Sequence, residues 1–196
     1  MLHYGEEPPI SGAFGTGAVF FSGCTLRCVY CQNREISEGG KGKPLEPGQL
    51  RAIFERLIDE GAQSIDLVTP TQFLPDILPA LTPKLPVPVV YNCGGYERVE
   101  TLRLLEGLVD VYLPDLKYAD NTLAARLSRA PDYFETATAA LREMYRQVGA
   151  AVLEDGSSPG DFWCGIWCFP GIWTIPSGSL NGWRRPFPRE TCWCPS

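Results

Sequence analysis

The sequence predicts an α/β fold in which a parallel sheet is built from about four strand–helix units. Short apolar segments alternate with longer amphipathic ones, and a polar or glycine-rich turn follows each apolar segment. This alternation is typical of parallel strands joined by right-handed helical crossovers. With 196 residues and 44% apolar side chains, the chain is long enough and apolar enough for one domain with a sizeable core.

The first strand–helix unit is predicted from an apolar run at residues 18–22, which ends at Gly23. Residues 24–44 are rich in cysteine, glycine and lysine and have no apolar period, so we expect a loop there. A helix is expected from Pro47 to Gly61, because apolar side chains recur every three or four positions. Its apolar stripe consists of Leu50, Ile53, Phe54, Leu57 and Ile58.

Three further units follow in the same order. The predicted strands are residues 64–68, 87–91 and 109–113, the predicted helices lie near 72–81 and 97–106, and helical patterns continue to about residue 148. The loops after the four strands are residues 23–44, 69–71, 92–95 and 114–117. Because the carboxyl ends of parallel strands meet at one edge of a sheet, we expect these four loops to converge there and to form the active site.

Charge and composition exclude several classes of function. The formal net charge of -6 argues against a nucleic-acid partner, and no segment is long and apolar enough to span a bilayer. Residues 1–9 lack the basic and apolar regions of a secretory signal, so a cytoplasmic protein without a membrane partner is expected. The single histidine, His3, removes most histidine-based catalytic and zinc sites.

Three of the eight cysteines lie close together, as Cys24, Cys28 and Cys31. In a chain without an export signal, such a cluster indicates metal ligands before disulfides. Three thiolates on one loop can hold three irons of a cubane iron–sulfur cluster and leave the fourth iron open to a small ligand. A zinc site with a fourth ligand elsewhere, or a redox-active pair beside an uninvolved cysteine, would also explain them.

Longer segments around these loops carry a family resemblance. They read Val-Phe-Phe-Ser-Gly-Cys-Thr-Leu-Arg-Cys-Val-Tyr-Cys-Gln-Asn at 19–33, Leu-Val-Thr-Pro-Thr at 67–71, Val-Tyr-Asn-Cys-Gly-Gly-Tyr at 90–96 and Pro-Asp-Leu-Lys-Tyr at 114–118. From about Gly12 to about Gly149 the chain resembles the radical S-adenosylmethionine (radical SAM) enzymes of the pyruvate formate-lyase activating enzyme group. The resemblance implies a partial βα barrel of the radical SAM type.

The resemblance implies a chemistry and its cofactors. A 4Fe–4S cluster on the three cysteines would reductively cleave S-adenosylmethionine (SAM) to a 5′-deoxyadenosyl radical, with flavodoxin or ferredoxin as the one-electron donor. The radical would abstract hydrogen from a backbone glycine of a partner glycyl-radical enzyme. A small-molecule or peptide substrate, an inactive truncated fragment and a zinc-binding module are the alternatives.

The resemblance also assigns residues around SAM. It would place Tyr30 beside the adenine of SAM, and Asp115 and Lys117 near the ribose and the carboxylate. Thr69 and Thr71 stand where the family's Gly-Gly-Glu contacts the methionyl amino group. Asn92, Gly94 and Gly95 would lie at the end of the third strand. Without the family, Gly94 and Gly95 would simply form a turn. Asp115 and Lys117 would be an exposed ion pair that contributes little, and Cys93 a small buried residue.

The chain divides into an N-terminal arm at 1–17, a core at 18–150 and an irregular tail at 151–196. All five tryptophans lie in 161–196, a segment without helical or strand periodicity. A second metal site on the tail cysteines would explain part of this composition; they are Cys164, Cys168, Cys192 and Cys194. We favour a change of reading frame near residue 155, because leucine and valine codons such as CTG and GTG yield tryptophan and cysteine when read out of frame.

Overall fold

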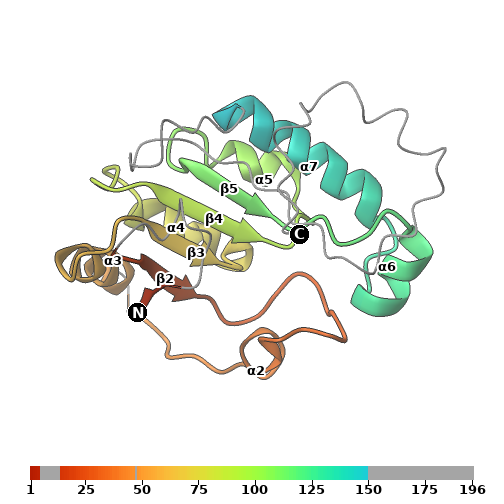
Figure 1. Cartoon of the computed structure of the whole chain (residues 1–196), viewed down its shortest axis with the longest axis horizontal. Coiled ribbons are helices and arrows are strands. Elements are labelled where there is room, and N and C mark those ends of the chain that lie inside the picture. The colour runs from red at the N-terminus through yellow and green to blue at the C-terminus, as the bar shows by residue number, and fades with distance from the viewer. Residues whose placement is uncertain (5–13, 47, 150–196) are drawn as a thin grey trace.

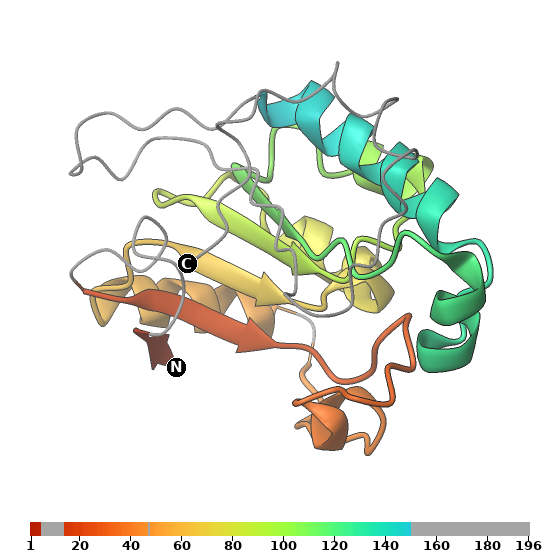
Figure 2. The same ribbon diagram turned by 45° about the vertical axis from the view of Figure 1, so that its right-hand side comes forward.

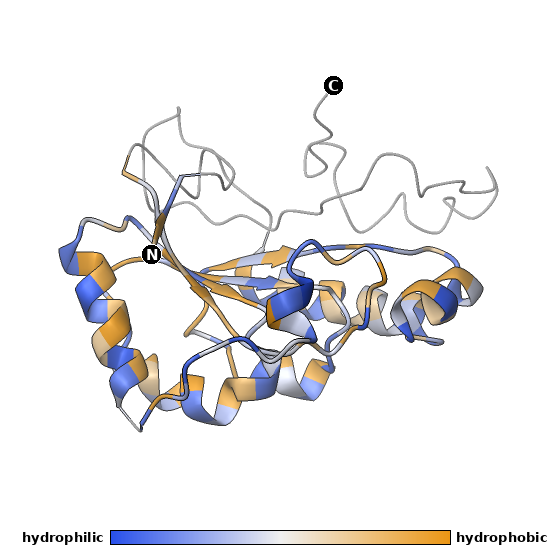
Figure 3. Ribbon diagram, turned by 90° about the horizontal axis from the view of Figure 1, so that it is seen from below, coloured by the Kyte–Doolittle hydropathy of each residue, from blue (hydrophilic) through white to orange (hydrophobic). Residues whose placement is uncertain are grey.

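The structure is a computed structural model that describes residues 1–4, 14–46 and 48–149. These residues form one five-stranded sheet in the order β1-β2-β3-β4-β5, and the helices other than the two at 34–37 and 121–128 lie along one side of it (Figures 1 and 3). Each strand therefore pairs with the next one along the chain. The predicted α/β fold with four strand–helix units is confirmed.

The four parallel strands end at the same edge of the sheet. The strands are β1 (Leu2–His3), which is antiparallel to β2, and the parallel strands β2 (Thr16–Phe20), β3 (Ile65–Val68), β4 (Val89–Cys93) and β5 (Val111–Pro114). In the register of the parallel pairs, Phe20 lies opposite Val68, Val68 opposite Asn92 and Asn92 opposite Leu113. The loops that follow these strands consequently start side by side, as the sequence predicts.

Apart from one short helix at 34–37, inside the segment predicted as a loop at 24–44, the helices follow the strands in the predicted alternation. They are α2 (Arg34–Ser37), α3 (Gln49–Asp59), the 3-10 turn η1 (Thr71–Phe73) with α4 (Leu74–Ala80), α5 (Val99–Arg103), α6 (Asn121–Ser128) and α7 (Tyr133–Val148). The predicted apolar stripe of α3 is confirmed, since Phe54 and Leu57 are fully buried. They pack with Ile65 and Leu67 of β3 in the main core.

Several boundaries differ from the sequence prediction. Strand β2 begins at Thr16, two residues before the apolar run, where Thr16 pairs with His3 of β1 and its hydroxyl bonds to that of Ser64 at 2.7 Å. The loop predicted at 92–95 begins later, since Asn92 and Cys93 are still paired in β4. The predicted N-terminal arm, residues 1–17, contains the short strand β1, in which His3 pairs with Thr16 of β2.

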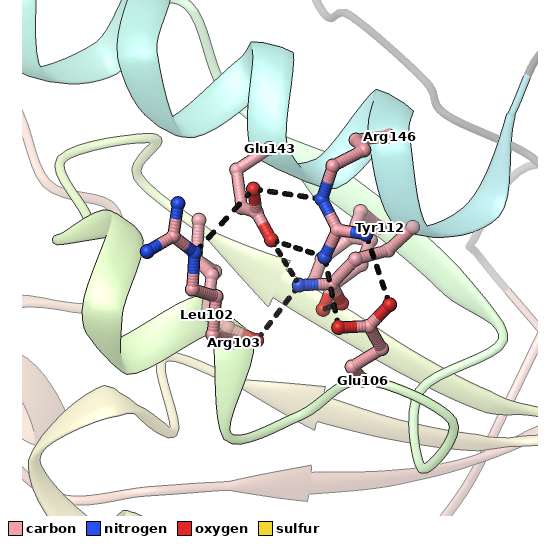
Figure 4. A network of polar contacts seen from close by, with 7 residues as sticks. Leu102, Arg103, Glu106, Tyr112, Glu143 and Arg146 are labelled. Carbon is pink, nitrogen blue, oxygen red and sulfur yellow. Dashed lines mark hydrogen bonds and ion pairs between the residues drawn. The ribbon is translucent and has the colours of Figure 1, made fainter.

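Helix α7 is fastened to its neighbours by a polar network (Figure 4). The Arg146 guanidinium bonds to the carboxylates of Glu143, at 2.7 Å, and of Glu106, at 2.8 Å. Gln147 accepts a hydrogen bond from the Tyr112 hydroxyl of β5 at 2.7 Å and donates one to the Leu102 carbonyl of α5 at 3.0 Å. These contacts fix the last turn of α7 against both α5 and β5.

Residues 151–196 lie outside the described residues, and with them the predicted tail, the change of reading frame and the tail cysteines. Among the helices that the structure describes, none is both long and apolar enough to cross a membrane.

The burial of Phe54 makes α3 the best test of the core. Phe54→Ala should lower the free energy of unfolding by about 3–5 kcal/mol, because it removes a fully buried ring and leaves a cavity. Phe14, which is 64% exposed, is the control. Phe14→Ala should change the free energy of unfolding by less than about 0.5 kcal/mol. Urea denaturation measures both, and equal effects would contradict the described packing of α3.

Candidate functional site

The segment between β2 and α2, residues 21–33, carries the three clustered cysteines and is called here the cysteine loop. It extends from the end of β2 to α6 (Figure 2). Its backbone bonds to the last turn of α6, because the Arg27 amide donates to the Ser128 carbonyl at 3.1 Å and the Val29 amide to the Leu127 carbonyl at 2.9 Å. A segment about a hundred residues away in sequence thus holds the loop in place.

The start of the cysteine loop is held by the neighbouring strand end. The Gln72 side-chain amide donates to the carbonyls of Ser22, at 3.0 Å, and Gly23, at 3.1 Å. The Thr69 hydroxyl donates to the Phe21 carbonyl at 3.4 Å, and the Thr69 amide to the Asn92 carbonyl at 2.8 Å. These bonds tie the ends of β2, β3 and β4 together just before the first cysteine.

The three cysteines are free thiols in different surroundings. Cys28 is buried, whereas Cys24 and Cys31 are half-buried. Burial raises the pKa of the Cys24 thiol. A backbone hydrogen bond lowers this pKa, and the neighbouring Cys28 and Cys31 raise it further. The hydroxyl of Ser37 lies 3.3 Å from the Cys31 sulfur, and the hydroxyl of Ser128 donates to the Cys28 sulfur at 2.9 Å.

A line of hydroxyl groups extends from Cys28 to the surface. The Ser128 hydroxyl bonds to that of Tyr118 at 2.6 Å, and the Tyr118 hydroxyl bonds to that of Tyr30 at 2.5 Å. Ser128 and Tyr118 are buried, whereas Tyr30 is 41% exposed. Tyr30, predicted to lie beside the adenine, is therefore accessible on the cysteine loop, and its hydroxyl is already bonded.

The two glycines after β4 make room for other parts of the protein. A Cβ on Gly94 would lie 2.7 Å from Leu26 Cδ1, and Leu26 is the buried side chain that anchors the cysteine loop. Gly95 has a φ of +74°, and a Cβ there would lie 2.6 Å from the Asp115 carbonyl oxygen. Both glycines thus serve a close approach between protein segments, and their contact with a ligand stays a prediction.

The Tyr133 hydroxyl connects the loops after β4 and β5. It lies within hydrogen-bond distance of two carbonyls, Gly94 at 2.7 Å and Asp115 at 2.6 Å, and it accepts from the Lys117 amide at 2.9 Å. Its ring stacks on Tyr96 with centroids 5.9 Å apart. Because Tyr133 is fully buried, these bonds fix the two loops against each other.

Asp115 and Lys117 form an ion pair that is largely buried on the lysine side, with 15% of the Lys117 side chain exposed. The alternative of an exposed ion pair is therefore wrong. Burial opposes the charge on Lys117, but Asp115 and the nearby Cys28 raise the pKa of this lysine above its usual value. Lys117 also acts electrostatically on Cys24, so a fixed positive charge stands beside two of the clustered cysteines.

Thr71 is engaged inside the protein. Its hydroxyl donates to Glu97 Oε1 at 2.9 Å and bonds to the Tyr91 hydroxyl at 2.9 Å. Glu97 is 2% exposed, and its other oxygen, Oε2, has no hydrogen-bond partner among the described residues. Burial raises the pKa of Glu97 to about 7, although the Thr71 hydroxyl lowers it. The hydroxyl proton of Thr71 is therefore already used in the hydrogen bond to Glu97.

The structure places the other candidate residues at the same strand edge. Asn92 lies next to the last residue of β4 and donates weakly to Asp66 Oδ2 at 3.5 Å. Cys93 is fully buried in the main core, as the sequence reading without the family predicts. The edge therefore gathers the cysteine loop, the Thr69–Thr71 turn, the two glycines and the Asp115–Lys117 pair.

Sequence reasoning missed the side chains that support this edge from a distance. They are Ser37, Glu97, Ser128 and Tyr133. Tyr118 lies in the segment 114–118 that carries the family resemblance, so a signal for it existed. Ser128 has none, because it lies 100 residues after Cys28 in an ordinary amphipathic helix.

The fold and the cysteine loop have counterparts among known proteins. Residues 18–152, more than half of the chain, match the radical SAM superfamily. Proteins of this superfamily use a 4Fe–4S cluster and SAM, the two cofactors that the family resemblance implies. They also generally require a one-electron donor.

Two individual proteins are similar to the chain. An uncharacterised protein of Methanocaldococcus jannaschii is 35% identical over 145 residues, which cover 69% of this chain and 42% of that protein. The crystal structure of HydG, a maturase of the FeFe-hydrogenase, matches 77% of this chain and 34% of HydG, with a TM-score of 0.52 and 14% identity. The chain spans less than half the length of either protein, and the likeness to HydG concerns the fold alone.

The contact between Gly95 and Asp115 predicts a measurable loss of stability. Gly95→Ala and Gly107→Ala both put a side chain at positive φ, +74° and +78°, which costs about 1–2 kcal/mol. Only at Gly95 would the new Cβ also overlap a backbone oxygen. Urea denaturation should therefore show a larger loss for Gly95→Ala than for Gly107→Ala, and equal losses would contradict the close approach.

Buried Glu97 predicts a pH-dependent stability. A carboxyl whose pKa is raised on folding stabilises the fold fully below its unfolded pKa of 4.5 and loses that contribution as the pH rises to about 7. Between about pH 4.5 and pH 8, the free energy of unfolding of the wild type should fall more than that of Glu97→Gln, by on the order of 3 kcal/mol. Glu100→Gln, on the exposed side of α5, is the control. Parallel pH profiles for wild type and Glu97→Gln would contradict the raised pKa.

Proposed function

Because the chain belongs to the radical SAM superfamily, we propose that Cys24, Cys28 and Cys31 hold three irons of a 4Fe–4S cluster and leave the fourth iron to SAM. The observation that carries this proposal is that one loop bears all three thiols and is held by backbone hydrogen bonds at the edge where β2 to β5 end. Three cysteine ligands rather than four are what a cluster with one open iron requires.

The chemistry of the surrounding residues suits such a cluster. Thiols are soft ligands that favour iron–sulfur clusters or zinc. Among the described residues, no three His, Cys, Asp or Glu side chains converge closely enough to bind one metal ion. A cubane cluster binds its cysteines through separate irons, so its ligands need not meet at one point. Lys117 adds a positive charge that would offset the negative charge of the thiolates.

When bound, the cluster and SAM supply the reductive cleavage that yields a 5′-deoxyadenosyl radical. The chain supplies the binding groups. We place Tyr30 against the adenine and the Asp115–Lys117 pair against the ribose and the carboxylate. Asn92, Gly94, Gly95 and the Thr69–Thr71 turn would complete the SAM site, with backbone atoms of Thr71 in place of its committed hydroxyl.

The proposed substrate is a protein backbone, as in the activating enzymes of glycyl-radical enzymes, with flavodoxin or ferredoxin as electron donor. The support is the four segments that resemble this group, at 19–33, 67–71, 90–96 and 114–118, which all lie at the ends of the four parallel strands. A small-molecule or peptide substrate is the alternative outcome. Glycyl-radical formation on a candidate partner, measured by electron paramagnetic resonance (EPR), would separate the two.

Removal of one proposed ligand tests the cluster. After anaerobic reconstitution with iron and sulfide, the wild type should contain about four irons and about four sulfides per chain. With dithionite and SAM it should then form 5′-deoxyadenosine. Cys28→Ala should lose both the cluster and the product, because one iron loses its thiolate.

Cys93→Ala is the matched control, since Cys93 is a buried free thiol outside the cysteine loop. It should keep both the cluster and the product. Zinc without sulfide in the wild type, or a cluster that persists in Cys28→Ala, would overturn the proposal. A cluster without product would leave the cluster assignment standing and count against catalysis by this chain.

A further inference from the structure

The Cys28 sulfur is the end point of three consecutive hydroxyl groups. Ser128 donates to Cys28 at 2.9 Å, Tyr118 lies 2.6 Å from Ser128, and Tyr30 lies 2.5 Å from Tyr118. These side chains come from three separate elements, namely α6, the loop after β5 and the cysteine loop itself. Ser128 is 1% exposed and Tyr118 is also 1% exposed, so water does not compete for the bond between them or for the bond from Ser128 to Cys28.

The direction of each hydrogen bond follows from the chemistry of the sulfur. A thiolate that binds iron carries no proton, so it can only accept, and Ser128 must donate to it. The single Ser128 proton is then used, so Ser128 must accept from Tyr118. By the same argument Tyr118 must accept from Tyr30. All three hydroxyls point their protons toward Cys28, and each bond polarises the next.

We propose that Ser128 is a positioning residue that raises the reduction potential of the cluster held by Cys28, and that Tyr118 and Tyr30 strengthen its effect. The inference rests on the proposed function. A reduced cluster carries one more negative charge, shared with its sulfurs, and a hydrogen bond to a ligand sulfur stabilises that charge. Electron entry would therefore be easier with the hydroxyl than without it.

The helix that carries Ser128 is built to keep this geometry. Asp120 caps α6, because its carboxylate accepts from the amides of Thr122, at 2.7 Å, and Leu123, at 3.2 Å. The helix ends at Arg129, which has a left-handed φ of +57°. The Ser128 carbonyl also accepts from the Arg27 amide, so backbone and side chain of one residue both contact the cysteine loop.

Substitutions that delete single hydroxyls test the inference. In Ser128→Ala the ratio of reduced to oxidised cluster at a fixed potential should fall by about tenfold, which is a midpoint lower by about 59 mV for a one-electron couple. Tyr118→Phe should shift the midpoint in the same direction by less, because Ser128 can still donate. Ser128→Thr keeps the hydroxyl and should restore the wild-type value. Potentiometric titration followed by EPR gives each midpoint.

Two variants serve as matched controls. Ser64→Ala removes another buried serine hydroxyl, which bonds to Thr16 at the start of the sheet, and Tyr112→Phe removes a buried tyrosine hydroxyl beside α7. Neither should move the midpoint. A merely structural role of Ser128 would change stability or cluster content without the graded shift in potential.

The outcomes separate this inference from the proposed function. A wild type that assembles no cluster would overturn the proposed function. Ser128→Ala with full iron and sulfide but an unchanged midpoint would overturn the inference and leave the function standing. If Ser128→Ala fails to load the cluster, Tyr118→Phe decides, and an unchanged midpoint in that variant would overturn the inference.

Discussion

The attachment of the cysteine loop to the last turn of α6 is the contact on which the candidate site depends. Two backbone bonds, from Arg27 to Ser128 and from Val29 to Leu127, hold the loop over the ends of the parallel strands. Leu26 anchors it from below in the space left by Gly94. Ordering a loop that has no regular structure costs about 1–2 kcal/mol of conformational entropy per residue, and these contacts offset that cost.

Hydrogen bonds from tyrosine hydroxyls join the loops at the same edge of the sheet to one another and to α6. Tyr133 joins the loops after β4 and β5, and Tyr118 joins the loop after β5 to α6. The rings of Tyr118 and Tyr133 also meet edge to face, with centroids 5.2 Å apart. The position of Lys117, the cation beside the cysteines, is thus set by Tyr133 of α7, which accepts from the Lys117 amide, and by the adjacent Tyr118, which bonds to Ser128 of α6.

Local sequence patterns were sufficient for the fold and for the cysteine loop. The apolar period of α3 and the alternation of strands and helices could be predicted because the pattern of buried side chains is visible within a short stretch of sequence. The extent of β2 was missed at Thr16, because a buried hydroxyl pair replaces apolar side chains there. Ser128 could not be predicted, since its contact with Cys28 exists only once the chain has folded. Thr71 was predicted as a SAM contact, but its bond to Glu97 depends on how the segment between β4 and α5 folds.

The most direct test of the central claim is a Mössbauer spectrum of the chain reconstituted with isotopically enriched iron, recorded with and without SAM. If the three cysteines of the loop leave one iron without a thiolate, the spectrum should show a cubane cluster, and SAM should change the signal of one iron alone. A cluster whose irons all keep their signals when SAM is added would contradict the account. So would iron that is bound without sulfide.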